Sequence, residues 1–222
     1  MNEIKATDLF DLSHSLAGCE LSAVTYPWEA LALIGKWIVK IGEGLDPARY
    51  DHPAPDVWIA KSASVAASAS ITGPCIIGEE AEVRHCAFIR GNALVGAGTV
   101  VGNSTELKNV ILVDKVQVPH YNYVGDSILG YHAHMGAGSI TSNVKGDKTL
   151  VVIKNGAERL ETGRKKVGAF LGDYAEIGCG CVLNPGTVVG ARTQIYPLVS
   201  VRGVLPPDSI CKNGDTVVPR KQ

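Results

Sequence analysis

Aliphatic residues recur at every sixth position along much of the chain. The first series consists of Ile59, Val65, Ile71, Ile77, Val83, Ile89, Val95, Val101 and Leu107. Four residues after most of its members comes a small side chain: Ala63, Ala69, Cys75, Ala81, Ala87, Ala93, Thr99 and Thr105. A period of six fits neither a 3.6-residue helix nor an alternating strand. It fits a prism in which each hexad forms one flat face and three hexads complete a turn.

The series continues with two five-residue steps and one long interruption. It passes through Leu112, Val118, Val124, Leu129 and Met135, stops near Asn143, and resumes at Leu171, Ile177, Leu183, Val189, Ile195 and Val201. We therefore predict a mainly β protein, a single-stranded left-handed parallel β-helix over residues 55–205, with coils about 4.8 Å apart. A conventional β-sandwich of short strands is the alternative, and the strict sixfold recurrence argues against it.

The N-terminal residues 1–54 lie outside the repeat and carry helical patterns. One short helix is expected over residues 8–16. A second is expected to begin at Pro27, with Glu29 in its first turn, and to end near Ile41. The apolar stripe of the second helix would pack on the prism or on a neighbouring subunit. A cap over the open end of the coils is one attractive role, because exposed strand edges invite aggregation.

Residues 145–166 form a polar insertion within the repeat. The run Val151-Val152-Ile153 and the basic run Arg164-Lys165-Lys166 predict an ordered excursion such as a hairpin. Long insertions in rigid scaffolds often carry function. Residues 206–222 are expected to form a C-terminal tail.

Composition narrows the compartment and the partners. The 222 residues are 45% hydrophobic and 19% charged, with a net charge of -1, which gives no reason to expect nucleic acid or an anionic membrane as partner. The longest apolar run, residues 30–41, is too short to span a bilayer. Without a secretion signal, the six cysteines are expected to be reduced thiols. A cytoplasmic location is the resulting expectation.

Stacking of the coils arranges polar residues in columns. Lys108 follows Leu107 as Arg90 follows Ile89, one turn earlier, so the two cations are expected about 5 Å apart. They could share an anion such as a phosphate, or be two solvated surface cations. His85 and His120 occupy one face position, with Asn103 between them and Ala137 on the next turn. A single surface histidine seldom has a function, so the surroundings of His120 decide its importance.

Those surroundings resemble a known family. The motifs are Val118-Pro119-His120-Tyr121-Asn122-Tyr123-Val124-Gly125-Asp126, then Met135-Gly136-Ala137-Gly138-Ser139-Ile140-Thr141, Asn143, Thr162-Gly163-Arg164-Lys165-Lys166-Val167-Gly168-Ala169, and Leu183-Asn184-Pro185-Gly186. They resemble the acetyltransferase domain of bifunctional N-acetylglucosamine-1-phosphate uridyltransferases, and still more their archaeal sugar-nucleotidyltransferase relatives, over residues 75–205.

The resemblance implies a set of roles. His120 matches the catalytic base, which takes a proton from the sugar amine as the amine attacks the acetyl thioester. Other positions match residues that bind the sugar phosphate (Arg90, Lys108), contact the substrate (Tyr123, His134, Asn143) or contact acetyl-CoA (Ala137, Cys179, Pro197). The backbone N–H near Ala137 would be an oxyanion donor. In the family, coenzyme A lies between adjacent prisms, so a homotrimer is implied.

Three positions depart from the family pattern. His134 stands in place of an Asn, Val144 in place of a Tyr, and Gly91 in place of a Pro. The acceptor could therefore differ from glucosamine-1-phosphate. Residues 1–54 contain no Gly-rich nucleotide loop, so no uridyltransferase activity is expected.

We therefore expect an acetyl-CoA-dependent N-acetyltransferase acting on an amino-sugar phosphate, glucosamine-1-phosphate or a relative, in UDP-N-acetylglucosamine biosynthesis. No metal is expected. One alternative is a transferase with another amino-sugar or hydroxyl acceptor. Another is a zinc enzyme of the γ-carbonic-anhydrase kind, with ligands among His85, His120, His132 and His134. A third is a non-catalytic trimeric scaffold or partner of a separate nucleotidyltransferase.

Overall fold

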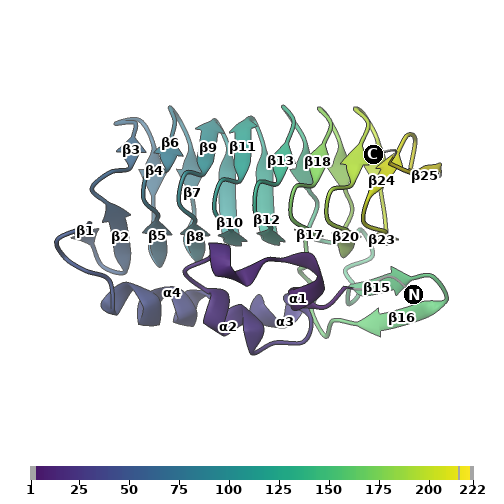
Figure 1. Ribbon diagram of the computed structural model, residues 1–222, viewed down its shortest axis with the longest axis horizontal. Helices are drawn as coiled ribbons and strands as arrows, with labels where there is room; N and C mark the ends of the chain where they lie inside the picture. The colour runs from purple at the N-terminus through teal and green to yellow at the C-terminus, as the bar shows by residue number, and fades with distance from the viewer. Residues whose placement is uncertain (1–3, 215, 221–222) are drawn as a thin grey trace.

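The computed structural model describes residues 4–214 and 216–220 and shows a stack of coils with helices along one side (Figure 1). Each full coil contributes short parallel strands to three flat faces. The predicted β-helix is confirmed.

The first face contains β3 (Ser64–Val65), β6 (Glu82–Val83), β9 (Val100–Asn103), β11 (Gln117–His120), β13 (His134–Met135), β18 (Glu176–Ile177), β21 (Gln194–Ile195) and β24 (Ser209–Cys211). The second contains β4 (Ser70–Ile71), β7 (Phe88–Ile89), the first parts of β10 (Glu106–Leu112) and β12 (Tyr123–Leu129), β14 (Ile140–Thr141), β19 (Val182–Leu183) and β22 (Ser200–Val201). The third contains β2 (Val57–Ala60), β5 (Cys75–Ile77), β8 (Ala93–Val95), the second parts of β10 and β12, β17 (Ala169–Leu171), β20 (Thr187–Val189) and β23 (Val204–Leu205).

The sixfold aliphatic residues fill the inside of the prism, as the sequence predicts. From Ile77 to Val201 every member of the series is buried, and Ile59, Val65 and Ile71 pack against this core at the first coils. Small residues such as Ala87 and Cys181 are buried among them. Because burial removes the apolar side chains from water, this core supplies the main driving force for coil formation.

The coils turn at three corners where many residues have a positive φ angle. Corner A, between the first and second faces, consists of Cys86, Ser104, Tyr121, Gly138, Gly180 and Leu198. Corner B, between the second and third faces, consists of Asn92, Asn109, Asp126, Gly186 and Gly203. Corner C, between the third and first faces, consists of Glu80, Gly98, Lys115, His132, Tyr174, Arg192 and Asp208. Gly, Asn and Asp tolerate this backbone conformation best, which explains their frequency at corner B.

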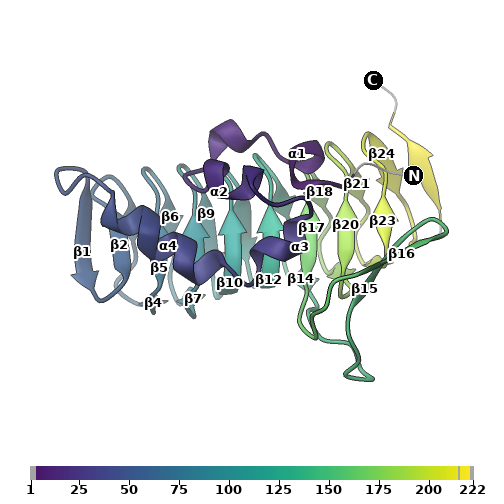
Figure 2. The ribbon, with the colours of Figure 1, turned by 90° about the horizontal axis from the view of Figure 1, so that it is seen from below.

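The N-terminal helices lie along the third face (Figure 2). They are α1 (Ala6–Leu9), the short 3₁₀ helix η1 (Leu12–His14), α2 (Gly18–Ser22), α3 (Pro27–Ala30) and α4 (Ile34–Glu43). The helix expected from Pro27 is broken by a turn at residues 31–33. In that turn the Leu31 carbonyl accepts a hydrogen bond of 3.1 Å from Asn109 of the prism.

The suggested cap over the open end of the coils is wrong. Outward residues of the third face are apolar, among them Ile76, Leu94, Ile111 and Phe170, and the buried side chains of the helices cover them. Antiparallel strands occupy the two ends instead: β1 (Tyr50–Ala54) pairs with β2, and β25 (Val217–Pro219) pairs with β24. Since β24 belongs to a coil, the coils continue into the segment expected to be a tail.

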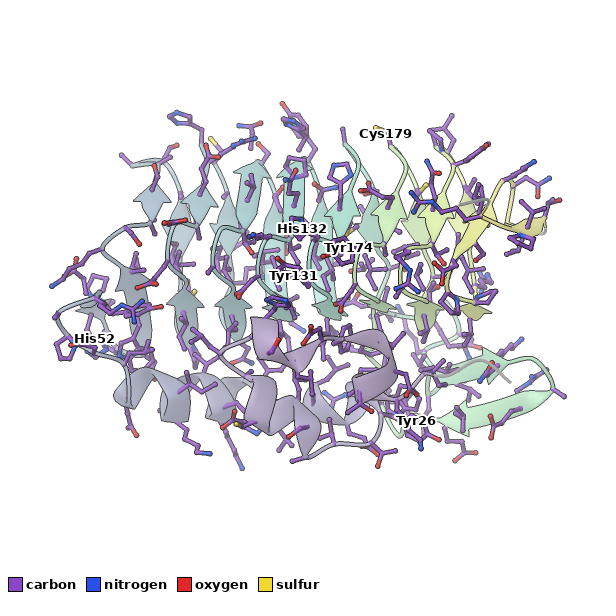
Figure 3. All side chains as sticks on the ribbon, in the orientation of Figure 1. Tyr26, His52, Tyr131, His132, Tyr174 and Cys179 are labelled. Carbon is purple, nitrogen blue, oxygen red and sulfur yellow. The ribbon has the colours of Figure 1, made fainter. Side chains whose placement is uncertain are left out.

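Asp173 fastens the helical segment at corner C. Its carboxylate accepts hydrogen bonds from the backbone N–H groups of Asp11 and Tyr131, both at 2.7 Å. His14 stacks on the Tyr131 ring with 3.7 Å between centroids, and Tyr131 lies beside His132 and Tyr174 (Figure 3). Burial of the Asp173 carboxyl raises its pKa.

The insertion forms the expected hairpin. Strands β15 (Val152–Asn155) and β16 (Glu158–Glu161) pair antiparallel and project beside the helices. The insertion leaves the coils after β14 and returns at β17, so it emerges at corner B. Its Val151 and Ile153 are buried in the cluster that contains the helices. Within the described residues, the model contains no helix of sufficient length and hydropathy to span a membrane.

Candidate active site

A column of side chains runs along the first face just before corner A. Asn103 pairs with His120, and the Asn103 side chain donates to the His85 carbonyl at 3.0 Å, so the expected stacking of the two histidines is confirmed. Backbone hydrogen bonds continue the register from His120 to Gly138 and from residue 137 to Gly180. The column is therefore His85, Asn103, His120, Ala137, Cys179 and Pro197.

His120 ends β11 with an exposed side chain, and Asn122 holds its backbone. The His120 N–H donates to the Asn122 side-chain oxygen at 3.1 Å. The buried Asn122 amide donates in turn to the carbonyls of Gly136 and Ser139 at 2.9 and 3.1 Å. One side chain thus fixes the turn after His120 against the turn that contains Ala137. Asn122 is not among the residues predicted for the site, although it lies within the His120 motif.

The rest of the column is open to solvent. Ala137, Cys179 and Pro197 are exposed, and Cys179 lies at the edge of the prism opposite the helices (Figure 3). Cys179 and Pro197 line a shallow pocket together with His134 and Glu176. His134 Nδ1 lies 3.0 Å from a Glu176 carboxylate oxygen. His134 therefore lies on the first face and has an acidic partner there.

The cations lie on the second face, toward corner B. Pairing of Leu107 with Ile89 places Lys108 beside Arg90, as predicted. Each cation has its own carboxylate: Arg90 contacts Glu106 at 2.6 Å, and Lys108 contacts Asp126 at 3.2 Å. The hydrogen bond and charge of Glu106 raise the pKa of Arg90. Each cation is thus paired within the chain, so a shared anion is not needed to hold the two together.

Asp126 is the centre of a hydrogen-bond network at corner B. The buried carboxylate accepts hydrogen bonds from the side-chain amides of Asn109 at 2.9 Å and Asn143 at 2.6 Å, in addition to its ion pair with Lys108. Asn143 also donates to the Tyr123 hydroxyl at 3.2 Å. Partial burial, and then the charge of Asp126, raise the pKa of Tyr123, so its phenol stays protonated at neutral pH. The network orients Lys108, Tyr123 and Asn143 together.

The predicted site residues thus fall into two groups. Lys108, Tyr123 and Asn143 form one network on the second face, with Arg90 next to it. The column of His120, Ala137, Cys179 and Pro197, with His134 nearby, lies on the first face. Corner A separates the groups, and no hydrogen bond or ion pair joins His120 to Lys108 or Arg90 in the described part of the chain. Residues 4–214 and 216–220 also contain no group of three or more His, Cys, Asp or Glu side chains that could hold a metal ion.

The chain is similar in sequence to one family model and to several known proteins. Residues 71–155 match a family model described as the GMPPB C-terminal domain. The chain is 30% identical over 145 residues to a bifunctional sugar-1-phosphate nucleotidylyltransferase/acetyltransferase of Sulfurisphaera tokodaii, covering 57% of this chain and 36% of that protein. It is 37% identical over 109 residues to the bifunctional protein GlmU of Methanococcus vannielii, covering 49% of this chain and 26% of the relative.

A shorter relative covers more of its own length. A putative uncharacterized acetyltransferase, YaiX of Escherichia coli, is 29% identical over 161 residues, covering 72% of this chain and 70% of that protein. Among solved structures, a mutant of AntD, an N-acyltransferase from Bacillus cereus in complex with dTDP and Coenzyme A, has a TM-score of 0.45 and 16% identity, covering 75% of this chain and 82% of its own.

The chain spans 36% of the length of the Sulfurisphaera tokodaii relative and 26% of that of the Methanococcus vannielii relative. Their names agree with the family that the His120 motif indicates, and with the acyltransferase class expected from it. The resemblance is therefore confirmed: the chain is similar to the acetyltransferase region of archaeal GlmU-like bifunctional sugar-1-phosphate nucleotidylyltransferase/acetyltransferases.

Proposed function

We propose that this protein is an acetyl-CoA-dependent N-acetyltransferase whose acceptor is an amino-sugar phosphate, glucosamine-1-phosphate or a relative. The names of the relatives support the reaction class. The observation that carries the proposal is the placement of His120, at the end of the first face, one corner away from the network that orients Lys108, Tyr123 and Asn143. A base and an anion-binding surface thus flank the same corner.

Each group has a role in acetyl transfer. Arg90 and Lys108 bind the sugar phosphate, and Tyr123 and Asn143 contact the sugar. The amine attacks the thioester carbonyl while His120 removes its proton, a task suited to an imidazole near neutral pH. The bond from the carbonyl carbon to sulfur then breaks, the thiolate of coenzyme A takes up a proton, and the N-acetyl sugar remains.

Acetyl-CoA is assigned to the column after His120. Ala137, Cys179 and Pro197 are exposed there and small enough to admit a bound chain. The Ala137 N–H makes no backbone hydrogen bond within the described residues, so it is available to stabilise the oxyanion of the tetrahedral intermediate.

A homotrimer with sites between subunits completes the proposal. Helices cover the third face, and no described helix lies on the first or second face. Corner A carries apolar side chains with large exposed fractions, 65% for Tyr121 and 84% for Leu198. Large exposed apolar side chains along one edge of the prism favour a protein contact there. A neighbouring subunit at corner A would enclose the thioester between two prisms.

The direct test is release of free thiol from acetyl-CoA with matched acceptors. Glucosamine-1-phosphate should support turnover and give an N-acetylated product by mass spectrometry. Glucose-1-phosphate, which has a hydroxyl in place of the amine, should not. Absence of thiol release across a panel of amino-sugar phosphates would refute the proposed function.

A further inference from the structure

A groove runs along corner B between helix α4 and the coils. It is lined on the helical side by Leu31, Ala32, Gly35, Lys36 and Val39, and on the prism side by Pro74, Asn92 and Asn109. We call it the corner-B groove. At one end it meets a second hollow, the basic basin, lined by Lys108, Asp126 and the insertion residues Gly163, Arg164, Lys165 and Lys166. Leu31, Ala32, Asn92 and Asn109 line both hollows, so the two are continuous.

The basic basin is built for an anion. Four cationic residues line the basin, together with a single carboxylate, that of Asp126. This carboxylate already accepts hydrogen bonds from Asn109, Asn143 and Lys108. The Nε atom of Arg164 is buried without a hydrogen-bond partner in the described structure. A buried donor without a partner is costly, and phosphate oxygens are strong acceptors for a guanidinium group.

The corner-B groove has a different chemistry. Leu31, Val39 and Pro74 provide apolar walls. The Asn92 side chain lies against Gly35, where a Cβ atom would come within 2.4 Å of the Asn92 oxygen, and no hydrogen bond joins its amide to another described residue. The groove thus combines apolar side chains with the Asn92 amide and with polar groups of α4, namely Lys36, Lys40 and Glu43. This combination suits a nucleobase, which has apolar faces and polar edges. An alkyl chain would leave the amide without a partner.

The order of these features along corner B matches the order of groups in one kind of molecule. Arg90 and Lys108 lie at the edge of the second face, the basic basin lies around the corner, and the corner-B groove continues from it. Pro74, Asn92, Asn109 and Asp126 lie on successive coils, a span of about 14 Å at the usual spacing of about 4.8 Å. That length accommodates a diphosphate followed by a nucleoside.

We infer that the acceptor is a nucleoside-diphosphate-linked amino sugar, with its diphosphate in the basic basin and its nucleoside in the corner-B groove. The inference rests on the proposed function for the reaction itself and refines its substrate class. It also gives the N-terminal helices a role in binding, because α4 and the turn before it form one wall of the corner-B groove.

Calorimetry on the full chain tests binding without relying on catalysis. UDP, dTDP, GDP and ADP are titrated beside pyrophosphate and the matching nucleosides. At least one nucleoside diphosphate should bind about tenfold or more tightly than pyrophosphate, a difference of about 1.4 kcal/mol. If none binds more tightly than pyrophosphate, the inference is overturned.

Variants assign the two parts of the ligand. Lys165→Ala should weaken binding of both the nucleoside diphosphate and pyrophosphate. Asn92→Gly, which suits the positive φ angle of this residue, should weaken only the nucleoside diphosphate, as should Val39→Trp, which fills the groove. Lys148→Ala, at an exposed position of the same insertion, is the matched control and should change neither. Equal effects of Asn92→Gly on both ligands would contradict the nucleoside assignment.

Turnover separates this inference from the proposed function. The kcat/KM for the nucleoside-diphosphate amino sugar should exceed that for the amino-sugar monophosphate by about tenfold or more. Efficient turnover of the monophosphate alone, without nucleoside-diphosphate binding, keeps the proposed function and overturns the inference. Nucleoside-diphosphate binding without acetyl transfer to any amine supports the groove assignment and refutes the proposed function.

Discussion

Corners A and B share a left-handed backbone and differ in almost everything else. At corner B, Asn109 and Asp126 are buried and hydrogen-bonded to each other, to the helical segment and to site residues. At corner A, Tyr121 and Leu198 are exposed, with no partner that fixes their side chains among the described residues. Corner B is organised within one subunit, whereas corner A presents a surface that another molecule can cover.

Under the proposed function, this difference would let one repeat provide both halves of a bimolecular reaction. Binding a phosphate requires cations held in place beforehand, and the network around Asp126 holds Lys108. Admitting a thioester and then enclosing it requires an open surface, and the column after His120 offers one. Matched substitutions at buried and exposed positions test this contrast.

Asp126→Asn should have the largest effect on stability. The substitution removes the buried negative charge beside Lys108 and places a side-chain NH2 group against the donors that the carboxylate had accepted. The expected loss is about 3 kcal/mol in the free energy of unfolding. Urea unfolding at fixed protein concentration measures it. Glu106→Gln, the same change at the more exposed pair with Arg90, should have little effect. Similar losses in both variants would contradict a larger contribution of the buried Asp126 network to the free energy of unfolding.

Asn109→Gly and Tyr121→Gly compare the corners at equivalent positions. Both residues have a positive φ angle, 56° and 52°, which Gly adopts without strain. Asn109→Gly should cost about 1–2 kcal/mol, because it removes hydrogen bonds to Leu31 and Asp126. Tyr121→Gly should cost less, because the exposed Tyr121 side chain makes no hydrogen bond within the described residues. Thermal unfolding measures both, and equal costs would contradict the comparison.

The smallest effect concerns pH at corner C, which combines a buried and an exposed carboxylate. Burial raises the pKa of Asp173, so its contribution is present at low pH and is lost as pH rises through the shifted value. The hydrogen bond with Arg192 lowers the pKa of Asp208, whose contribution is instead lost as pH falls.

Asp173→Asn should therefore cost more at about pH 4 than at about pH 7, and Asp208→Asn should cost more at about pH 7. The measurement is urea unfolding of both variants and the native chain at each pH. The same pH trend in both variants would show that burial does not raise the pKa of Asp173.

Much of the fold could be predicted because the sixfold period is a local property. Inward residues from Ile77 to Val201, the stacking of Arg90 on Lys108, and the hairpin in the insertion all follow from it or from short patterns beside it. The place of the helices could not be predicted. Their apolar stripe shows that they pack on something, but the outward residues of the third face, such as Phe170, are not marked by the period.

The network around Asp126 also escaped prediction. Its members Asn109 and Asn143 come from different coils, and the five-residue steps in the repeat shift the register between them. Asn122 was missed for a related reason: its acceptors at Gly136 and Ser139 lie on the next coil, and nothing local indicates that its amide points inward. The motif indicated which residues are grouped in sequence, whereas the hydrogen bonds depend on how the coils stack.

The proposed role of His120 as catalytic base has a natural control in His85. Both are exposed histidines in one column, two coils apart, and only His120 precedes Tyr123 and Asp126 on the same coil. The decisive measurement is kcat for acceptor-dependent acetyl transfer by His120→Ala and His85→Ala. The account predicts a loss of about a hundredfold or more for His120→Ala and a change within about twofold for His85→Ala. Equal rates in the two variants, or full activity of His120→Ala, would contradict it.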